Sequence, residues 1–211
     1  MNTDMIRYYR ERAPEYEAVY ARPEDQPDLD RMAAIFQAIF LEKNVLEIAC
    51  GTGYWTEYVA QTARTVCATD INQSVLDIAV AKSYPRGNVR FRVEDIFERH
   101  PGEHFDALLG GFIWSHILLE RLDEFLDRAL DRVVPGGLVV FADSQFLPNR
   151  STPTSHTDTA GNNFQTRRLL DGSEHLVLKN FPSPEFLREK LPRAKVLELE
   201  HFWVALAVRP A

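Results

Sequence analysis

The sequence has few cysteines and no cluster of metal-binding residues. Among its 211 residues there are only two cysteines, Cys50 and Cys67, and they show no metal-ligand spacing with each other or with the histidines. Two cysteines are also too few for a disulfide framework. We therefore expect both thiols to be reduced and to lie in or near the core. No metal site is expected.

An excess of basic residues is also absent. The 24 lysines and arginines are outnumbered by 31 aspartates and glutamates, which gives a formal net charge of -7. Non-specific affinity for nucleic acid comes from clustered Lys and Arg side chains that release counterions from the phosphate backbone. A nucleic-acid partner is therefore not expected.

Long hydrophobic runs are missing as well. No apolar stretch approaches the ~20 residues that a helix needs to span a bilayer. Residues 1–4 lack the basic start and the apolar run of a secretory signal. We expect a cytoplasmic protein with no membrane partner.

The composition is that of one ordinary globular domain. Hydrophobic residues make up 45% of the chain, which is enough for one sizeable core, while 211 residues are too few for two full domains. We therefore predict a single domain over residues 1–211.

Short apolar runs alternate with segments of helical spacing through the first two thirds of the chain. This alternation is typical of βαβ units, and so of a parallel sheet with helices on both faces. In such sheets ligands bind beyond the carboxyl ends of the strands. Asp28 is a plausible N-cap for the first helix, and the Pro-Gly-Gly run at 135–137 is expected to end the last one. The predicted strands are 45–49, 65–69, 89–93, 105–109 and 138–142, and the predicted helices are 28–42, 54–63, 74–81 and 118–134.

The last third of the chain has a different pattern. Residues 148–163 are rich in Pro, Ser, Thr, Asn and Gly and predict a long loop. A hairpin is expected over 164–179, because Asp171-Gly172 is a strong turn signal. A helix to about residue 191 should follow Ser183, and residues 195–200 and 202–208 predict two final strands.

Three predicted strand ends have groups suited to a nucleoside. Gly51 and Gly53 follow the first strand, where a backbone without Cβ atoms can approach a ligand closely. Asp70 ends the second strand, where a carboxylate can accept hydrogen bonds from ribose hydroxyls. Asp95 follows the third strand beside Ile96, and this pair can flank an adenine ring.

A dinucleotide is not the expected ligand. A dinucleotide site needs a third glycine three residues after the second, and Thr56 stands at that position. The acidic Glu47 just before the glycines would repel a pyrophosphate but suits a cationic ligand that contains an amino acid. A nicotinamide-dependent oxidoreductase is therefore disfavoured.

These motifs together resemble the class I S-adenosylmethionine-dependent methyltransferases over residues 45–144. The run EIACGTG at 47–53 is similar to their first motif, with Ala49 where glycine is commoner, and FDALLGG at 105–111 resembles their fourth strand. The resemblance implies a Rossmann-like α/β fold: a seven-stranded, mostly parallel sheet with its last strand antiparallel and helices on both faces. It also implies a cofactor, S-adenosylmethionine, with S-adenosylhomocysteine as product. The cofactor-binding residues that it implies are Glu47, Ala49, Gly51, Gly53, Tyr54, Asp70, Ile71, Asp95, Ile96, Gly111 and Tyr16.

The N-terminal segment resembles the lid of the small-molecule branch of that family. This resemblance makes Tyr20 a candidate to face the transferred methyl group, because the face of an electron-rich ring attracts a sulfonium; alternatively, the lid tyrosines only pack on the domain. His116 follows the fourth strand and is either a general base for the acceptor or a side chain that only lines the pocket. Arg167 and Arg168 either hold a substrate carboxylate or lie on a solvated strand edge.

These expectations combine into one hypothesis. The chain is expected to methylate an oxygen or nitrogen of a small-molecule acceptor, as a monomer or homodimer; the alternative is a non-catalytic cofactor-binding module with a regulatory or subunit role. The predicted parts are an N-terminal lid at 1–27, a cofactor-binding core at 43–145, a loop and hairpin cover with a β-hairpin insertion at 148–180, and a C-terminal helix and strand pair at 183–211.

Overall fold

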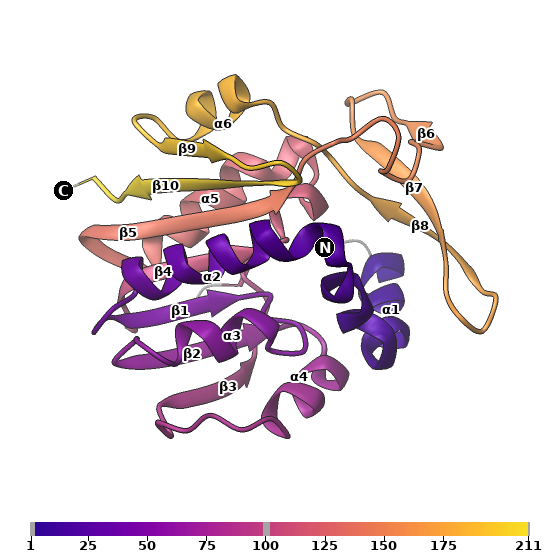
Figure 1. Cartoon of the computed structure of the whole chain (residues 1–211). Coiled ribbons are helices and arrows are strands. Elements are labelled where there is room, and N and C mark those ends of the chain that lie inside the picture. The colour runs from indigo at the N-terminus through magenta and orange to yellow at the C-terminus, as the bar shows by residue number, and fades with distance from the viewer. Residues whose placement is uncertain (1–2, 99–101, 211) are drawn as a thin grey trace.

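A mixed sheet forms the centre of the molecule. The structure is a computed structural model that describes residues 3–98 and 102–210. Within these residues, seven strands form one sheet in the order β3-β2-β1-β4-β5-β10-β9 (Figure 1). Only β10 runs antiparallel to its neighbours, β5 and β9, so the predicted sheet is confirmed. The strands are β1 Asn44–Ile48, β2 Thr65–Asp70, β3 Val89–Val93, β4 Phe105–Gly111, β5 Val133–Ser144, β9 Lys195–Glu198 and β10 Phe202–Val208.

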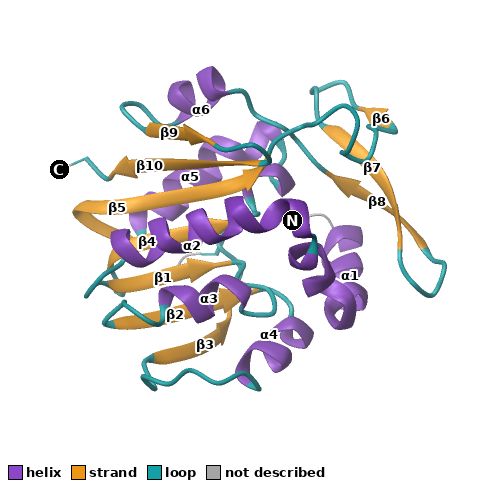
Figure 2. Cartoon of the chain, in the orientation of Figure 1, coloured by secondary structure: helices purple, strands orange, loops and turns teal. Residues whose placement is uncertain are grey.

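Helices cover both faces of this sheet (Figure 2). One face packs against the helices α2, α3 and α4, which contribute Met32, Trp55 and Leu76 to one apolar cluster. The other face packs against α5 and α6, which contribute Phe125 and Leu187 to a second cluster. The helices are α2 Gln26–Ile39, α3 Tyr54–Val59, α4 Gln73–Val80, α5 Leu122–Asp131 and α6 Pro184–Lys190.

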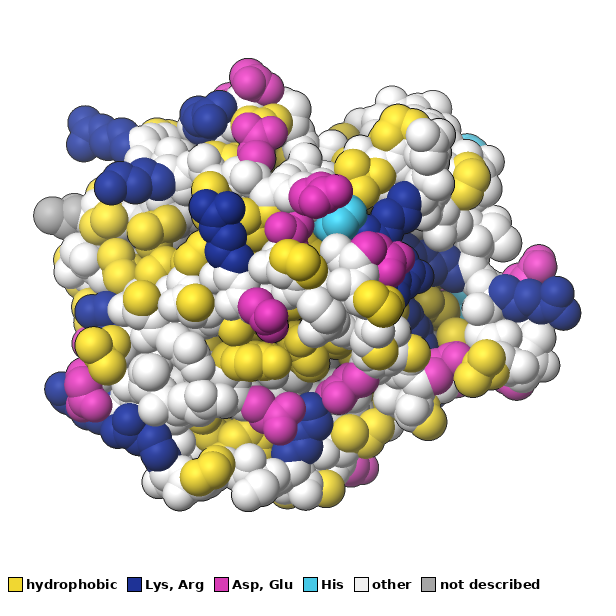
Figure 3. Space-filling view, viewed as in Figure 1, with side chains coloured by type: hydrophobic (Ala, Val, Ile, Leu, Met, Phe, Trp, Pro, Cys, Tyr) yellow, Lys and Arg dark blue, Asp and Glu magenta, His cyan; other side chains and the backbone are white. Residues whose placement is uncertain are grey.

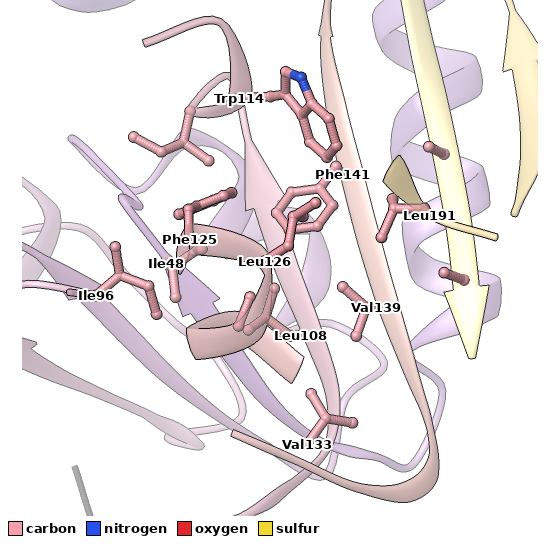
Figure 4. Close-up of a cluster of buried hydrophobic side chains, with 14 of the residues drawn as sticks. Ile48, Ile96, Leu108, Trp114, Phe125, Leu126, Val133, Val139, Phe141 and Leu191 are labelled. Carbon is pink, nitrogen blue, oxygen red and sulfur yellow. The ribbon is translucent and has the colours of Figure 1, made fainter. Parts of the chain in front are cut away.

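The side chains of the central strands point alternately to the two faces of the sheet and so contribute to both apolar clusters. Successive side chains of a strand point to opposite faces, so a strand covered on both sides is apolar at every position. In β4, Leu108 belongs to the cluster around α5 while Leu109 belongs to the cluster around α2. Figure 4 shows Phe125 of α5 beside Ile48 and Phe141, which come from two strands of the sheet. Most polar groups of the central strands therefore lie at or near the strand ends, and the buried Glu47 in β1 is an exception.

The N-terminal segment lies across the carboxyl ends of the parallel strands, toward which their arrowheads point in Figure 1. It consists of α1, Thr3–Arg12, followed by the 3-10 segments η1, Ala13–Ala21, and η2, Pro23–Asp25. Helix α1 packs against strand β8 of the insertion, where the rings of Tyr8 and His175 lie 5.3 Å apart. The lid and the insertion therefore contact each other over the end of the sheet.

The insertion after β5 forms a separate small sheet that projects from the body of the molecule (Figure 1). Strands β7, Asn163–Arg168, and β8, Glu174–Leu178, form the predicted hairpin around Asp171-Gly172. A third strand, β6 at His156–Thr157, pairs with β7 inside the stretch that we predicted to be loop throughout. Two short 3-10 segments, η3 at Trp114–His116 and η4 at Leu119–Arg121, lie between β4 and α5.

Several predicted boundaries are wrong because tertiary contacts decide them. Helix α2 begins at Gln26, so Asp28 is not its N-cap; the Asp28 carboxylate instead accepts a hydrogen bond from the backbone N–H of His201 at 2.7 Å. Helix α5 starts only at Leu122, and α3 ends at Val59. The Pro-Gly-Gly run at 135–137 does not end a helix but lies within β5, beside a shift in the β4–β5 register.

The two cysteines have no sulfur partner. Cys50 and Cys67 are both free and buried, as expected.

None of the helices in the described part of the chain is both long enough and apolar enough to cross a membrane.

Gly110 in β4 packs directly against a buried aromatic ring. A Cβ atom on Gly110 would lie 2.6 Å from the Phe141 ring, which is fully buried, whereas one on Gly111 would lie 3.2 Å from Trp55. Overpacking of a dense core typically costs ~1–3 kcal/mol. We expect Gly110→Ala to lower the free energy of unfolding by about that amount, and Gly111→Ala by less, as measured by urea denaturation. An unchanged urea midpoint for Gly110→Ala would contradict this packing.

Candidate active site

A pocket opens at the carboxyl ends of β1 to β4, beneath the N-terminal segment. Its lining includes the turn after β1 and the ends of β2, β3 and β4, which the sequence predicted to converge. Of the predicted cofactor-binding residues, the ones that line this pocket are Tyr16, Ala49, Gly51, Asp70, Ile71, Asp95, Ile96 and Gly111. We call it the first pocket.

Asp70 holds the turn after β1 in place. The backbone N–H of Gly51 donates to Asp70 Oδ2 at 3.0 Å, and the N–H of Asn72 donates to Oδ1 at 2.9 Å. Burial raises the pKa of Asp70, while these two backbone donors act in the opposite direction. Each carboxylate oxygen can accept more than one hydrogen bond. Asp70 therefore has acceptor capacity left toward the first pocket.

The next strand end supplies an apolar slot with a polar edge. Asp95 Oδ1 accepts a hydrogen bond from the backbone N–H of Phe97 at 2.9 Å, which fixes the turn after β3. Ile96 is buried beside it, and Met5, Ile71 and Val75 add further apolar lining. A slot of this composition suits a flat, weakly polar ring.

Three predicted cofactor residues do not belong to the lining of the first pocket. Glu47 is buried behind it, where burial raises its pKa to about 8 although Thr56 donates a hydrogen bond to its Oε2 at 2.7 Å. Tyr54 is partly exposed, and its ring stacks on the buried ring of Tyr20 with 3.8 Å between the ring centroids.

Gly53 is the third of these residues, and it has a packing role in this structure. Its φ of +81° is unfavourable for other residues, and a Cβ there would lie 2.7 Å from the Tyr84 hydroxyl and 3.1 Å from the Ala79 Cβ. The absent side chain therefore allows α4 and the segment after it to approach α3.

A second cavity adjoins the first pocket. It is enclosed by the N-terminal segment, the insertion and the end of β5. The side chains that line both cavities are Tyr9, Tyr16, Phe112 and His116, and we call this group the junction. The two cavities therefore share a boundary made of three aromatic rings and one imidazole.

His116 is held at the junction in one tautomer. Its Nδ1 lies 2.6 Å from the carbonyl oxygen of Leu178, which can only accept, so Nδ1 has the proton. In the neutral ring Nε2 then accepts a hydrogen bond from the Tyr9 hydroxyl at 2.7 Å. Burial and the nearby Lys179 ammonium lower the pKa of His116 to about 3. The imidazole is therefore neutral at physiological pH.

Tyr9 is a site residue that sequence reasoning did not single out. Burial raises the pKa of its hydroxyl above the usual value, so it remains a neutral donor toward His116. The aromatic N-terminal run marked this segment as a lid. Nothing in the sequence indicated which tyrosine meets a histidine 107 residues away.

Tyr20 lies farther from the first pocket than expected. It is buried and lines only the second cavity, with its ring edge-on to Phe112 at 5.9 Å. Tyr16 lies between Tyr9 and Tyr20 and lines both cavities. Whether Tyr20 faces a methyl group stays a prediction.

A buried ion pair supports the junction from the side of the insertion. Lys179 Nζ donates to Asp143 Oδ1 and to Ser115 Oγ, each at 2.7 Å, and the backbone N–H of Ser115 donates to Asp143 Oδ2 at 3.0 Å. Burial by itself raises the pKa of Asp143, but the Lys179 charge holds it below the usual value. This network joins β5, the residue that follows β8, and η3, which contains His116, and therefore positions His116.

Charged side chains of the insertion face different ways. Arg167 lines the second cavity, whereas its neighbour Arg168 is exposed and does not.

Among residues 3–98 and 102–210, no group of three or more His, Cys, Asp or Glu side chains is placed to hold a metal ion.

The tautomer of His116 is directly testable. Because its folded pKa lies below the unfolded value, we expect nitrogen NMR to show a neutral ring with a protonated Nδ1 from pH 8 down to about pH 4. The same shift predicts that the free energy of unfolding falls as the pH falls below 6.5, since the unfolded chain then binds the extra proton. Titration of His116 near pH 6.5 would contradict the geometry.

Comparison with known proteins is consistent with this arrangement. A family model described as "Methyltransferase domain" matches residues 45–137. Malonyl-[acyl-carrier protein] O-methyltransferase 2 of Ilyobacter polytropus is 29% identical over 47% of this chain and 38% of its own length. Ubiquinone biosynthesis O-methyltransferase of Agrobacterium fabrum is 28% identical over 73% of this chain and 55% of its own length. The chain thus matches only about two fifths to about half of these relatives.

Solved structures match over the whole chain. The structure described as "DhpI-SAH complex structure" superposes with a TM-score of 0.80 at 29% identity and covers 99% of this chain and 96% of its own. The structure described as "DhpI-SAM-HEP complex" has a TM-score of 0.81 at 28% identity and covers 100% of both chains. The similarity therefore includes the lid and the insertion.

Proposed function

Because this chain belongs to the class I S-adenosylmethionine-dependent methyltransferases, we propose that it transfers the methyl group of S-adenosylmethionine to an oxygen or nitrogen of a small-molecule acceptor. One observation supports this most strongly. The first pocket, at the strand ends, and the second cavity share the side chains of the junction, so a cofactor in one and an acceptor in the other would meet there.

The residues of the first pocket fit S-adenosylmethionine. Asp70 would bind the ribose hydroxyls, Asp95 and Ile96 would flank the adenine, and Gly51 and Gly111 would leave room for the methionine part. The bound cofactor supplies an electrophilic methyl group on a sulfonium. The rings of the junction suit a neighbouring cation, since the face of an aromatic ring attracts positive charge.

The junction would align the reacting atoms and exclude water. Displacement at a methyl carbon depends mainly on alignment of the nucleophile with the departing sulfur, so positioning supplies most of the rate. Tyr9 and Tyr16 come from the N-terminal segment, and would close over the methyl group when that segment is docked on the insertion. Tyr20, at the second cavity, would contact the methyl group only from the acceptor side.

Two roles for His116 remain within this proposal. As a general base, it would accept a proton from the acceptor at Nε2; as a positioning residue, it would hold Tyr9 over the junction. The hydrogen bond from the Tyr9 hydroxyl already occupies Nε2, and an imidazole with a pKa of about 3 is a weak base. These observations favour the positioning role.

The second cavity also favours an enzyme over a cofactor-binding module. A module with a regulatory or subunit role needs the first pocket only, whereas this chain also has a second cavity beside the junction, lined by polar and charged side chains.

Cofactor binding provides the direct test. We expect S-adenosylhomocysteine to bind the full chain in calorimetry and NAD not to bind. Asp70→Asn should weaken the binding of S-adenosylhomocysteine about 10- to 100-fold, because hydrogen bonds to a charged acceptor contribute about 1.5–3 kcal/mol. Asp77→Asn is the matched control, since Asp77 lies exposed on α4 and does not line the first pocket. No heat with S-adenosylhomocysteine would refute the proposal.

Turnover separates the two roles of His116. With an acceptor found by screening for S-adenosylhomocysteine release, we expect His116→Ala to lower kcat about tenfold, and Tyr9→Phe to lower it by a similar factor, because both remove the same hydrogen bond. The pH dependence of kcat between 6 and 8 should not change. A loss of about 10²–10⁴-fold for His116→Ala alone would instead indicate a general base.

A further inference from the structure

The second cavity is strongly basic in an otherwise acidic protein. Five cationic side chains, Arg12, Arg22, Arg150, Arg167 and Lys179, line it together with a single carboxylate, while the whole chain has a net charge of -7. Figure 3 shows Lys and Arg side chains gathered in the hollow between the body of the molecule and the projecting insertion. Positive charge is therefore concentrated where the acceptor would enter.

Internal partners neutralise two of these cations. Arg150 pairs with the buried Asp25 at 2.5 Å, and Lys179 pairs with the buried Asp143 at 2.7 Å. Both pairs link separate segments of the chain. The positive charges of Arg150 and Lys179 are therefore already balanced by carboxylates of the protein itself.

Arg12, Arg22 and Arg167 have no such neutralisation. Within the described residues none of the three forms an ion pair. Arg22 is exposed to solvent, whereas Arg12 and Arg167 are only partly exposed where they line the second cavity. An uncompensated cation in a partly desolvated site is costly unless an anion binds beside it.

Neutral groups hold both guanidinium groups in place. Arg12 lies over the rings of Tyr8 and Tyr16, 5.6 and 5.2 Å from their centroids, so it reaches the edge of the junction. Arg167 donates through Nε and Nη2 to Gln165 Oε1, at 3.3 and 2.7 Å, and Gln165 is itself fully buried. Both arginines keep further N–H donors that no contact within the protein uses, and a planar guanidinium suits a two-oxygen anion.

We propose that the acceptor presents an oxyanion, a carboxylate or a phosphoryl group, which Arg12 and Arg167 bind in the second cavity beside the junction. This inference rests on the proposed methyltransferase function and adds the chemical class of its substrate. The two arginines come from the lid and from the insertion. An anion between them would therefore also hold the lid against the insertion.

Binding of small anions to the full chain, saturated with S-adenosylhomocysteine, tests the proposal without any turnover. The probes are inorganic phosphate and propionate, which distinguish the two oxyanion sources, and propionamide as the neutral analogue of propionate. Calorimetry at constant ionic strength should show binding of at least one anion and none of propionamide. Absence of binding by both anions would overturn the proposal, while bound S-adenosylhomocysteine would leave the methyltransferase function intact.

Substitutions of Arg167 and Arg168 test whether the anion binds at the arginine pair. Arg167→Gln should weaken binding of that anion at least about tenfold, and Arg167→Lys should restore part of it because the charge returns. Arg168→Gln is the matched control on the same strand, since Arg168 is exposed and does not line the second cavity. An equal loss in Arg168→Gln, or none in Arg167→Gln, would overturn the assignment.

A further variant guards against indirect effects of the lid. Arg12→Gln should likewise weaken anion binding about tenfold, and its affinity for S-adenosylhomocysteine and its melting temperature show whether the lid is still docked. If the lid of the Arg12→Gln variant is no longer docked, the result for Arg167→Gln alone tests the proposal, because Arg167 belongs to the insertion and not to the N-terminal segment.

Discussion

The hydrogen bond from the Gly51 N–H to Asp70 determines how this molecule can present a site. It joins the turn after β1 to the end of β2, so the two strand ends keep a fixed spacing. The φ of +56° at Gly51 turns the backbone toward the carboxylate, a conformation that glycine adopts without strain. The groups at the ends of β3 and β4 are placed relative to this corner, because β3 and β4 are in register with β2 and β1.

Burial of the sheet on both faces explains why chemistry gathers at its edge. Most interior positions of β1 and β4 belong to the two apolar clusters, and the buried carboxyl group of Glu47 in β1 accepts a hydrogen bond from Thr56. At the last paired residues and just beyond them that constraint ends, and Asp70, Asp95 and His116 lie there. The lid and the insertion then cover the edge, and their contact with each other completes a cavity that the sheet alone would leave open.

The features of the fold that depend on local sequence patterns could be predicted from the sequence. The strands, their parallel order and the convergence of Gly51, Asp70 and Asp95 follow from alternation and from the residues at strand ends. Helix boundaries were less predictable: α2 begins two residues early, where Asp28 serves a contact with His201 instead of a cap. The Tyr9–His116 hydrogen bond could not be predicted, because it depends on how the lid docks on a distant loop. The roles toward the cofactor or the methyl group stay predictions for all of the predicted site residues, including Glu47, Gly53, Tyr54 and Tyr20.

The separation of charge between the two cavities has a consequence for the proposed reaction. Asp70 and Asp95 lie in the first pocket, on the side proposed for the cofactor, whereas Arg12 and Arg167 lie in the second cavity. With a sulfonium on one side and an oxyanion on the other, two opposite charges would face each other across the junction in a poorly solvated space. Coulomb attraction is stronger there than in water. The anion would then offset the repulsion between the arginines and the sulfonium, so that a charged acceptor and a charged cofactor would stabilise one another only when both are bound and the lid is docked.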